Sequence, residues 1–184
     1  LTDSIAARID GTWMKRHGFL EDVISGRDVN DRDRWLLRAQ GLYEPAENLS
    51  VRIVGDISKR DEECCAAVYL PGRDVVRTGP TTIGYQPSSI LAIERGLGAV
   101  INDDPYDREV SITPGRNYNS RVDDWGVSGE IVYDIGGGAE VTSITAYRVN
   151  DFVRGQDTDF NNLDIWFRDD GGRSANKIKT FSQE

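Results

Sequence analysis

The sequence predicts an all-β fold: an antiparallel transmembrane β-barrel segment of about six strands, with long extracellular loops and short periplasmic turns. The first indication is that tryptophan and tyrosine recur eight residues apart, as Trp35 with Tyr43 and as Trp125 with Tyr133. Residues an even number apart share a strand face, and eight steps of about 3.3 Å separate the rings by roughly 26 Å. A strand tilt of about 40° leaves roughly 20 Å, close to the ~25 Å apolar band that aromatic girdles bracket on an outer-membrane barrel.

The second indication is that the strands are joined by connections of alternating length. We expect strands at residues 4–15, 32–43, 49–59, 124–135, 139–151 and 177–184. Residues 44–48, with a proline and an asparagine, and the glycines at 136–138 are typical of tight turns. Between them lie long polar stretches at residues 16–31, 60–123 and 152–176. Short turns on one side and long loops on the other are the outer-membrane arrangement of periplasmic and extracellular connections.

Alternation along the strands predicts which side chains face lipid. With the short turns in the periplasm, Trp13, Trp35 and Trp125 form the outer girdle, and Tyr43 and Tyr133 form the inner one. The expected lipid face then takes the following residues: Ile5, Ala7, Ile9 and Gly11; Leu37, Ala39 and Gly41; Leu49, Val51, Ile53, Gly55 and Ile57; Val127, Gly129 and Ile131; and Val141, Ser143, Thr145, Tyr147 and Val149. The lumen receives these charged residues: Arg8, Asp10, Arg38, Arg52, Asp56, Glu130, Asp134 and Arg148. The fifth strand fits least well, because Ile144 and Ala146 face inward, and the parity of the last strand stays open.

Composition excludes some classes of protein. The chain has 184 residues, a net charge of -9 and a mean hydropathy of -0.50. No stretch approaches the ~20 consecutive apolar residues that a spanning helix needs, so a helical membrane bundle is excluded. A barrel is compatible with low hydropathy, because its lumen and loops are polar. The acidic excess argues against a nucleic-acid partner, which selects basic patches.

Few residues suggest a catalytic, metal-binding or cofactor-binding site. Cys64 and Cys65 are adjacent, so a vicinal disulfide is one possibility, and two ligands do not make a structural zinc site. His17 is the single histidine and has no evident catalytic partner nearby in the sequence. The glycines at 136–138 lack the flanking strand and helix of a phosphate-binding loop, and we interpret them as a turn. The sequence therefore predicts no catalytic residue, no cofactor site and no enzyme.

One acidic segment resembles part of a calcium loop. Asp157, Asp159 and Asn161 place oxygen atoms at alternating positions, as in the first half of an EF-hand. The twelfth position is Arg168, where the motif needs a bidentate glutamate. An exposed polar loop is the alternative interpretation, and no firm metal site is predicted.

Three segments together resemble the barrel of TonB-dependent outer-membrane receptors: residues 33–56, residues 142–148 (Thr-Ser-Ile-Thr-Ala-Tyr-Arg) and residues 179–184 (Lys-Thr-Phe-Ser-Gln-Glu). They are structural motifs of hairpins and carry over no binding residue. The resemblance implies a 22-stranded barrel, a plug domain and an upstream box that engages TonB. The chain begins at Leu1 without a signal peptide and ends within an expected strand, so we expect a barrel fragment, residues 1–184, without its plug.

The expected function is TonB-coupled uptake of a scarce ligand, such as a siderophore or another nutrient, across the outer membrane of a Gram-negative bacterium. The expected partners are outer-membrane lipid, the TonB energy-coupling complex and the nutrient itself. Two alternatives stay open. One is a passive outer-membrane channel built from the same hairpins. The other is a soluble, secreted, β-rich binding module that holds calcium in an acidic loop.

Overall fold

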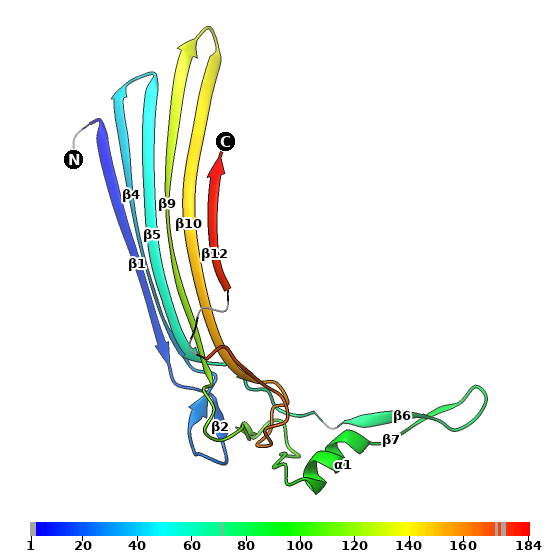
Figure 1. Ribbon diagram of the computed structural model, residues 1–184. Helices are drawn as coiled ribbons and strands as arrows, with labels where there is room; N and C mark the ends of the chain where they lie inside the picture. Colours follow the sequence, from blue (N-terminus) through cyan, green and yellow to red (C-terminus); the bar gives the residue numbers. More distant parts are fainter. Residues whose placement is uncertain (1–2, 71, 172, 174–175) are drawn as a thin grey trace.

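The computed structural model describes residues 3–70, 72–171, 173 and 176–184. Within these residues, long antiparallel strands form one curved sheet, which Figure 1 shows rising from a layer of loops. The long strands are β1 (Ile5–Arg16), β4 (Arg32–Ala46), β5 (Leu49–Glu63), β9 (Asn119–Gly136), β10 (Ala139–Asp157) and β12 (Asn176–Gln183). Their order is β1-β4-β5-β9-β10, and β12 pairs with β10. The short strand β11 (Phe167–Asp169) pairs with the far end of β10 and is the seventh member.

All six predicted strands are present, and several extend beyond their predicted ends. The main extension is at the loop end, where β5, β9 and β10 continue several residues into segments predicted as loop. The sheet is antiparallel throughout and is open in the described residues, with β1 and β12 at its two edges. An antiparallel, β-rich fold is therefore confirmed.

The two short turns lie where the sequence places them. Ala46 pairs with Leu49, so a two-residue turn joins β4 to β5, and the register shifts at Glu44 and Pro45. A proline cannot donate to the ladder, which suits it to such an irregularity. At the other turn Gly137 and Gly138 have φ of 68° and 81°. A two-residue hairpin turn with both residues at positive φ favours glycine at both positions.

The predicted long loops contain further structure. Strands β2 (Leu20–Asp22), β3 (Asp28–Val29) and β8 (Glu109–Val110) form a small sheet at the base of the long strands. The segment predicted as one loop at residues 60–123 also holds a hairpin, β6 (Arg73–Arg77) with β7 (Ile83–Pro87), and the helix α1 (Ser89–Gly96). Figure 1 shows this hairpin and helix extending away from the long sheet. The prediction of a plain loop there is wrong.

The packed core lies in the loop layer. Its buried apolar residues are Leu20, Val29, Ala66, Val110, Ile112 and Tyr118, with Val68 and Phe167 packed against them. In contrast, most large apolar side chains of the long strands are exposed, and Ile9 is 74% exposed. Among the residues that the structure describes, no helix is both long enough and apolar enough to cross a lipid bilayer.

The strand register separates the sheet into two faces. In one cross-strand row Ile9, Ala39, Gly55, Val127 and Tyr147 lie opposite one another, and Phe181 continues the row onto β12. We call this the apolar face. The other side, which carries the predicted lumen charges, is the polar face. The row also resolves the parity of the last strand: Phe181 and Lys179 share the apolar face, while Ile178 and Thr180 share the polar one.

Candidate functional site

Three hollows open along the polar face. One of about 870 Å³ lies beside the short turns, one of about 230 Å³ lies around Arg8 and Arg52, and one of about 640 Å³ lies at the loop end. Their linings are drawn mainly from polar-face positions on several strands. A sheet is hollow on the side toward which it curves, so the polar face is the concave one.

The predicted lumen charges share this face and form cross-strand ion pairs. Arg148 on β10 reaches across β9 to Asp56 on β5, with Nη2 2.8 Å from Oδ1, and it also contacts Asp124. Gly126 lies between Arg148 and Asp56 in the register. A Cβ atom there would lie 3.0 Å from the Arg148 Cζ, so the glycine makes room for the guanidinium. The side chains of Asp56 and Asp124 are 17% and 19% exposed.

The other predicted charges lie along the same face. Arg52 and Glu130 face each other across β5 and β9, with Nη2 and Oε2 3.1 Å apart. Arg38 lies opposite Asp10 on one side and Asp56 on the other. Two further charges complete the predicted set: Arg8, which pairs with Asp10 at 2.7 Å, and Asp134, which lies opposite Glu140. The charges therefore alternate in sign along much of this face.

The five predicted girdle aromatics all lie on the apolar face. Trp13 and Trp35 are direct cross-strand partners, and the Trp125 ring lies 5.7 Å from that of Tyr147. Each of the five is at least 39% exposed in this chain.

The hollow at the loop end has an apolar floor that the sequence pattern did not indicate. The alternation assigns Met14 and Leu36 to a wet lumen, Val122 and Phe152 fall in segments predicted as loop, and the parity of the strand with Ile178 is open, yet all five residues line this floor. They occupy two adjacent rows of the register on strands β1, β4, β9, β10 and β12.

Arginines gather at the rim of this hollow. Arg34 and Arg60 are direct cross-strand partners, although like charges in that position repel. Arg34 donates two hydrogen bonds to the buried Glu62 carboxylate, at 2.7 and 2.8 Å, and Arg32 lies 3.7 Å from it. Arg60 has no ion pair among the described residues, and its Nε atom is buried without a hydrogen-bond partner there. Two guanidinium groups thus share one carboxylate, and the third has no carboxylate partner in the described part of the chain.

The calcium candidate residues are engaged within the loop layer. The Asp157 carboxylate accepts hydrogen bonds from the backbone N–H groups of Thr113, Asp159 and Phe160, at 2.9 to 3.1 Å. Asn161 accepts one from Leu163 N–H and donates one to the Tyr69 hydroxyl. The described part of the chain contains no group of three or more histidine, cysteine, aspartate or glutamate side chains placed to hold a metal ion. These hydrogen bonds order the loop.

Burial, followed by the neighbouring Asp159 carboxylate, raises the pKa of Asp157 to about 7. Desolvation disfavours the ionised carboxylate, and a nearby like charge has the same effect. Burial likewise raises the pKa of Tyr118, whose ring lies 5.8 Å from the Arg27 guanidinium carbon. The loop layer therefore contains a carboxyl that titrates near neutral pH.

The remaining candidates are simpler. Cys64 and Cys65, at the end of β5, are joined by a disulfide. His17 is exposed between β1 and β2.

The site as a whole is a concave, charged surface with an apolar hollow and an arginine-rich rim. Its chemistry suits the binding and passage of a polar or charged solute. No known protein family, curated protein or solved structure matches this chain. The function of this chain is therefore inferred from the geometry of its two faces and its hollows.

Proposed function

We propose that this chain is part of the wall of an outer-membrane β-barrel receptor that takes up a scarce nutrient by TonB-coupled transport. The observation that carries the proposal is the two-faced sheet: the apolar face is bounded by aromatic rows, and the concave face is charged. A transmembrane barrel needs this arrangement, because its convex side contacts lipid and its lumen contacts water.

The stagger of the aromatic side chains between β4 and β9 supports a tilted barrel wall, whereas Trp13 on β1 is level with Trp35 on β4. Trp35 on β4 lies opposite Lys59, whereas Trp125 on β9 lies opposite Ile57, two residues closer to the turns. Tyr133 is displaced from Tyr43 in the same direction by two residues. Two residues are about 6.6 Å and two strand spacings are about 9.6 Å, which corresponds to a tilt of roughly 35°. Strands of outer-membrane barrels tilt by about 35–45°.

The open edges support membership in a larger barrel. Within the described residues β1 and β12 each have one unpaired edge. Unpaired backbone groups are not tolerated in the hydrocarbon core of a membrane, so further strands must pair with them. Six long strands are also fewer than the eight of the smallest outer-membrane barrels.

The TonB-dependent character rests on the hairpin resemblance. In such a receptor the loops would capture the ligand, the charged concave face would line the passage, and energy would enter through the plug. The parent protein would sit in the outer membrane of a Gram-negative bacterium. No catalytic role is proposed for any residue.

Cell fractionation and bilayer recordings test the proposal. The protein should sediment with outer membranes, require detergent for extraction, and migrate differently on gels before and after boiling. In planar bilayers a plugged receptor should give no stable open conductance, whereas a steady open pore would favour the passive channel. A monodisperse monomer in detergent-free buffer would overturn the membrane assignment and favour the secreted binding module.

A further inference from the structure

The hairpin and helix form one projection, which we call the arm (residues 73–96). The Asp74 carboxylate accepts hydrogen bonds from the Ser89 backbone N–H at 2.9 Å and from its hydroxyl at 2.6 Å. These bonds join β6 to the first turn of α1 and lower the pKa of Asp74. The Ser88 N–H also donates to the Gly72 carbonyl at 3.1 Å. The hairpin and the helix of the arm are therefore connected by their own contacts.

One face of the hairpin is apolar and cationic. Val75 pairs with Tyr85, and Arg77 pairs with Ile83, so these four side chains share a face with Arg73. Val75, Ile83 and Tyr85 are each more than 60% exposed. Within the described residues neither arginine on this face has an ion pair, whereas Asp74 lies on the opposite face. Exposed aromatic and aliphatic side chains flanked by arginine are typical of a binding surface.

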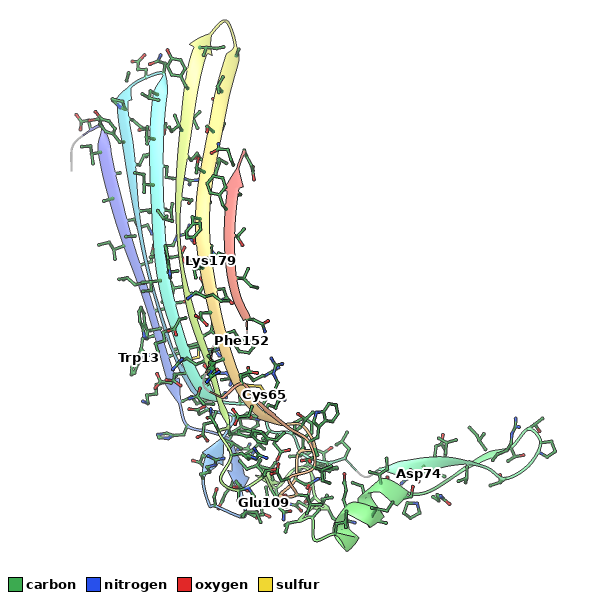
Figure 2. The ribbon with its side chains drawn as sticks, viewed as in Figure 1. Trp13, Cys65, Asp74, Glu109, Phe152 and Lys179 are labelled. Atoms are coloured by element: carbon green, nitrogen blue, oxygen red, sulfur yellow. A yellow bond between two sulfur atoms is a disulfide. The ribbon has the colours of Figure 1, made fainter. Side chains whose placement is uncertain are left out.

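The arm lies at the loop end of the long sheet, where the hollow floored by Phe152 also lies. In Figure 2 Phe152 lies near the loop end of the strands, and the arm at Asp74 extends from that same end, away from the strands. In the proposed receptor the loop end is the barrel mouth.

The hollow has a deficit of negative charge. Arg32 and Arg34 share the carboxylate of Glu62, whereas Arg60, which lies opposite Arg34 across β4 and β5, has no ion pair among the described residues. A buried guanidinium N–H without a partner is costly, and a carboxylate is the group that suits a guanidinium best. The chain as a whole has a net charge of -9, so this cationic cluster runs against its composition.

We propose that the hollow binds an organic anion with an apolar body, and that the arm helps to capture it. The carboxylate of the ligand pairs with Arg60, and its apolar body covers the floor at Leu36, Val122 and Phe152. Arg73 and Arg77 attract the anion toward the mouth. A neutral oligosaccharide would leave these arginines unpaired. The inference rests on the proposed function for the direction of uptake, and it adds the class of solute.

The first test compares two probes that differ in charge alone. Binding of 2-naphthoate and of uncharged 2-naphthamide to the detergent-purified protein is measured by their intrinsic fluorescence. We expect naphthoate to bind at least about ten-fold more tightly, because a charge-assisted hydrogen bond is formed by the carboxylate alone. Equal affinity for the two probes, or tighter binding of maltohexaose than of naphthoate, would overturn the inference.

The second test locates the anion. Arg60→Gln should weaken naphthoate binding by roughly ten-fold and leave naphthamide unchanged. The double variant Arg73→Gln with Arg77→Gln should mainly slow association, with a weaker salt dependence, because these charges act by steering. Lys179→Gln is the matched control, since it removes the same charge from the apolar face. If the control weakens binding as much as Arg60→Gln does, the assignment fails.

The outcomes separate this inference from the proposed function. Outer-membrane fractionation with no preference for naphthoate would overturn the anion site and leave the barrel intact. A soluble protein that still prefers naphthoate through Arg60 would overturn the barrel and leave the site intact. The probe comparison on the unmodified protein requires no variant to fold.

Discussion

Placing an arginine at Ile53 tests directly whether the apolar face contacts lipid. On β4 the midpoint between Trp35 and Tyr43 is Ala39, which lies opposite Gly55 on β5. On β9 the midpoint between Trp125 and Tyr133 is Gly129, which lies opposite Ile53. The centre of the band on β5 therefore falls between residues 53 and 55, and Ile53 lies about one residue, or ~3 Å, from it.

The expected cost of Ile53→Arg follows from this depth. An arginine on the lipid face near the midplane costs about 2 to 4 kcal/mol. Ile53 is 57% exposed and lies between Gly41 and Gly129, so no neighbouring side chain would shield the charge. The folding equilibrium constant should fall by a factor of roughly thirty to several hundred. Urea titration of the protein folded in lipid vesicles, followed by tryptophan fluorescence, measures the free energy of unfolding.

Val54→Arg is the matched control. Val54 is the next residue of the same strand, and it lies on the polar face between Gln40 and Ser128. A charge there meets water and other charged groups, so its effect on the free energy of unfolding should be small. Equal destabilisation by both substitutions, or greater destabilisation by Val54→Arg, would refute the assignment of the faces.

Three further outcomes are expected. Arg148→Gln should cost about 1–3 kcal/mol in urea titrations, because the largely buried Asp56 and Asp124 carboxylates lose their guanidinium partner and only Asp124 keeps a hydrogen bond, from Asn150; no change would mean that these carboxylates are solvated. Asp157 has a raised pKa in the folded state, so its contribution to stability should be lost as pH rises from about 4 through about 7. Amide exchange in the loop layer should therefore be faster at pH 8 than at pH 5 after correction for intrinsic rates, and Asp157→Asn should remove the difference. Cysteines placed at Thr81 and Gly137 should be labelled on intact cells at Thr81 alone, and labelling at Gly137 alone would reverse the topology.

The long strands could be predicted from the sequence because their pattern is local and strong. Three local signals determine each hairpin independently of the rest of the chain. They are alternation with period two, aromatic residues at a fixed spacing, and turns that contain glycine or proline. The charges predicted for one face do share it, from Arg52 opposite Glu130 to Arg148 beside Asp56. Ile144 and Ala146, the apolar residues that the alternation placed on the inward face, do lie on the polar face.

The loop layer could not be predicted in the same way. Its strands have two or three residues, too few to show a period, and long-range side-chain bonds hold them. The buried Asp22 carboxylate, for example, accepts a hydrogen bond from the N–H of Ile112, 90 residues away. The sequence did contain patterns typical of the hairpin and helix of the arm, within a segment that is polar on average. Val75 and Val76 precede a Gly-Pro turn, and Ile90, Ile93 and Leu97 recur at helical spacing.

The apolar hollow was missed for a different reason. Alternation assigns each residue to a face but does not distinguish one level of that face from another. Leu36 falls on the polar face by parity, so a rule based on parity assigns it to water, and Val122 lies in a segment predicted as loop. The strand register, which brings apolar residues of five strands into two adjacent rows, becomes visible only when the strands are paired.

The position of the core links these observations. The buried apolar cluster belongs to the loop layer, while the apolar face of the long sheet has many exposed large side chains, from Ile9 to Phe181. A free soluble sheet would bury such a face against a second layer, because monomers rarely expose a contiguous apolar patch of this extent. The described residues place no second layer there, which is consistent with the proposed contact of this face with lipid. The aromatic side chains that bound the face, staggered between β4 and β9 as in a tilted wall, support the same proposal.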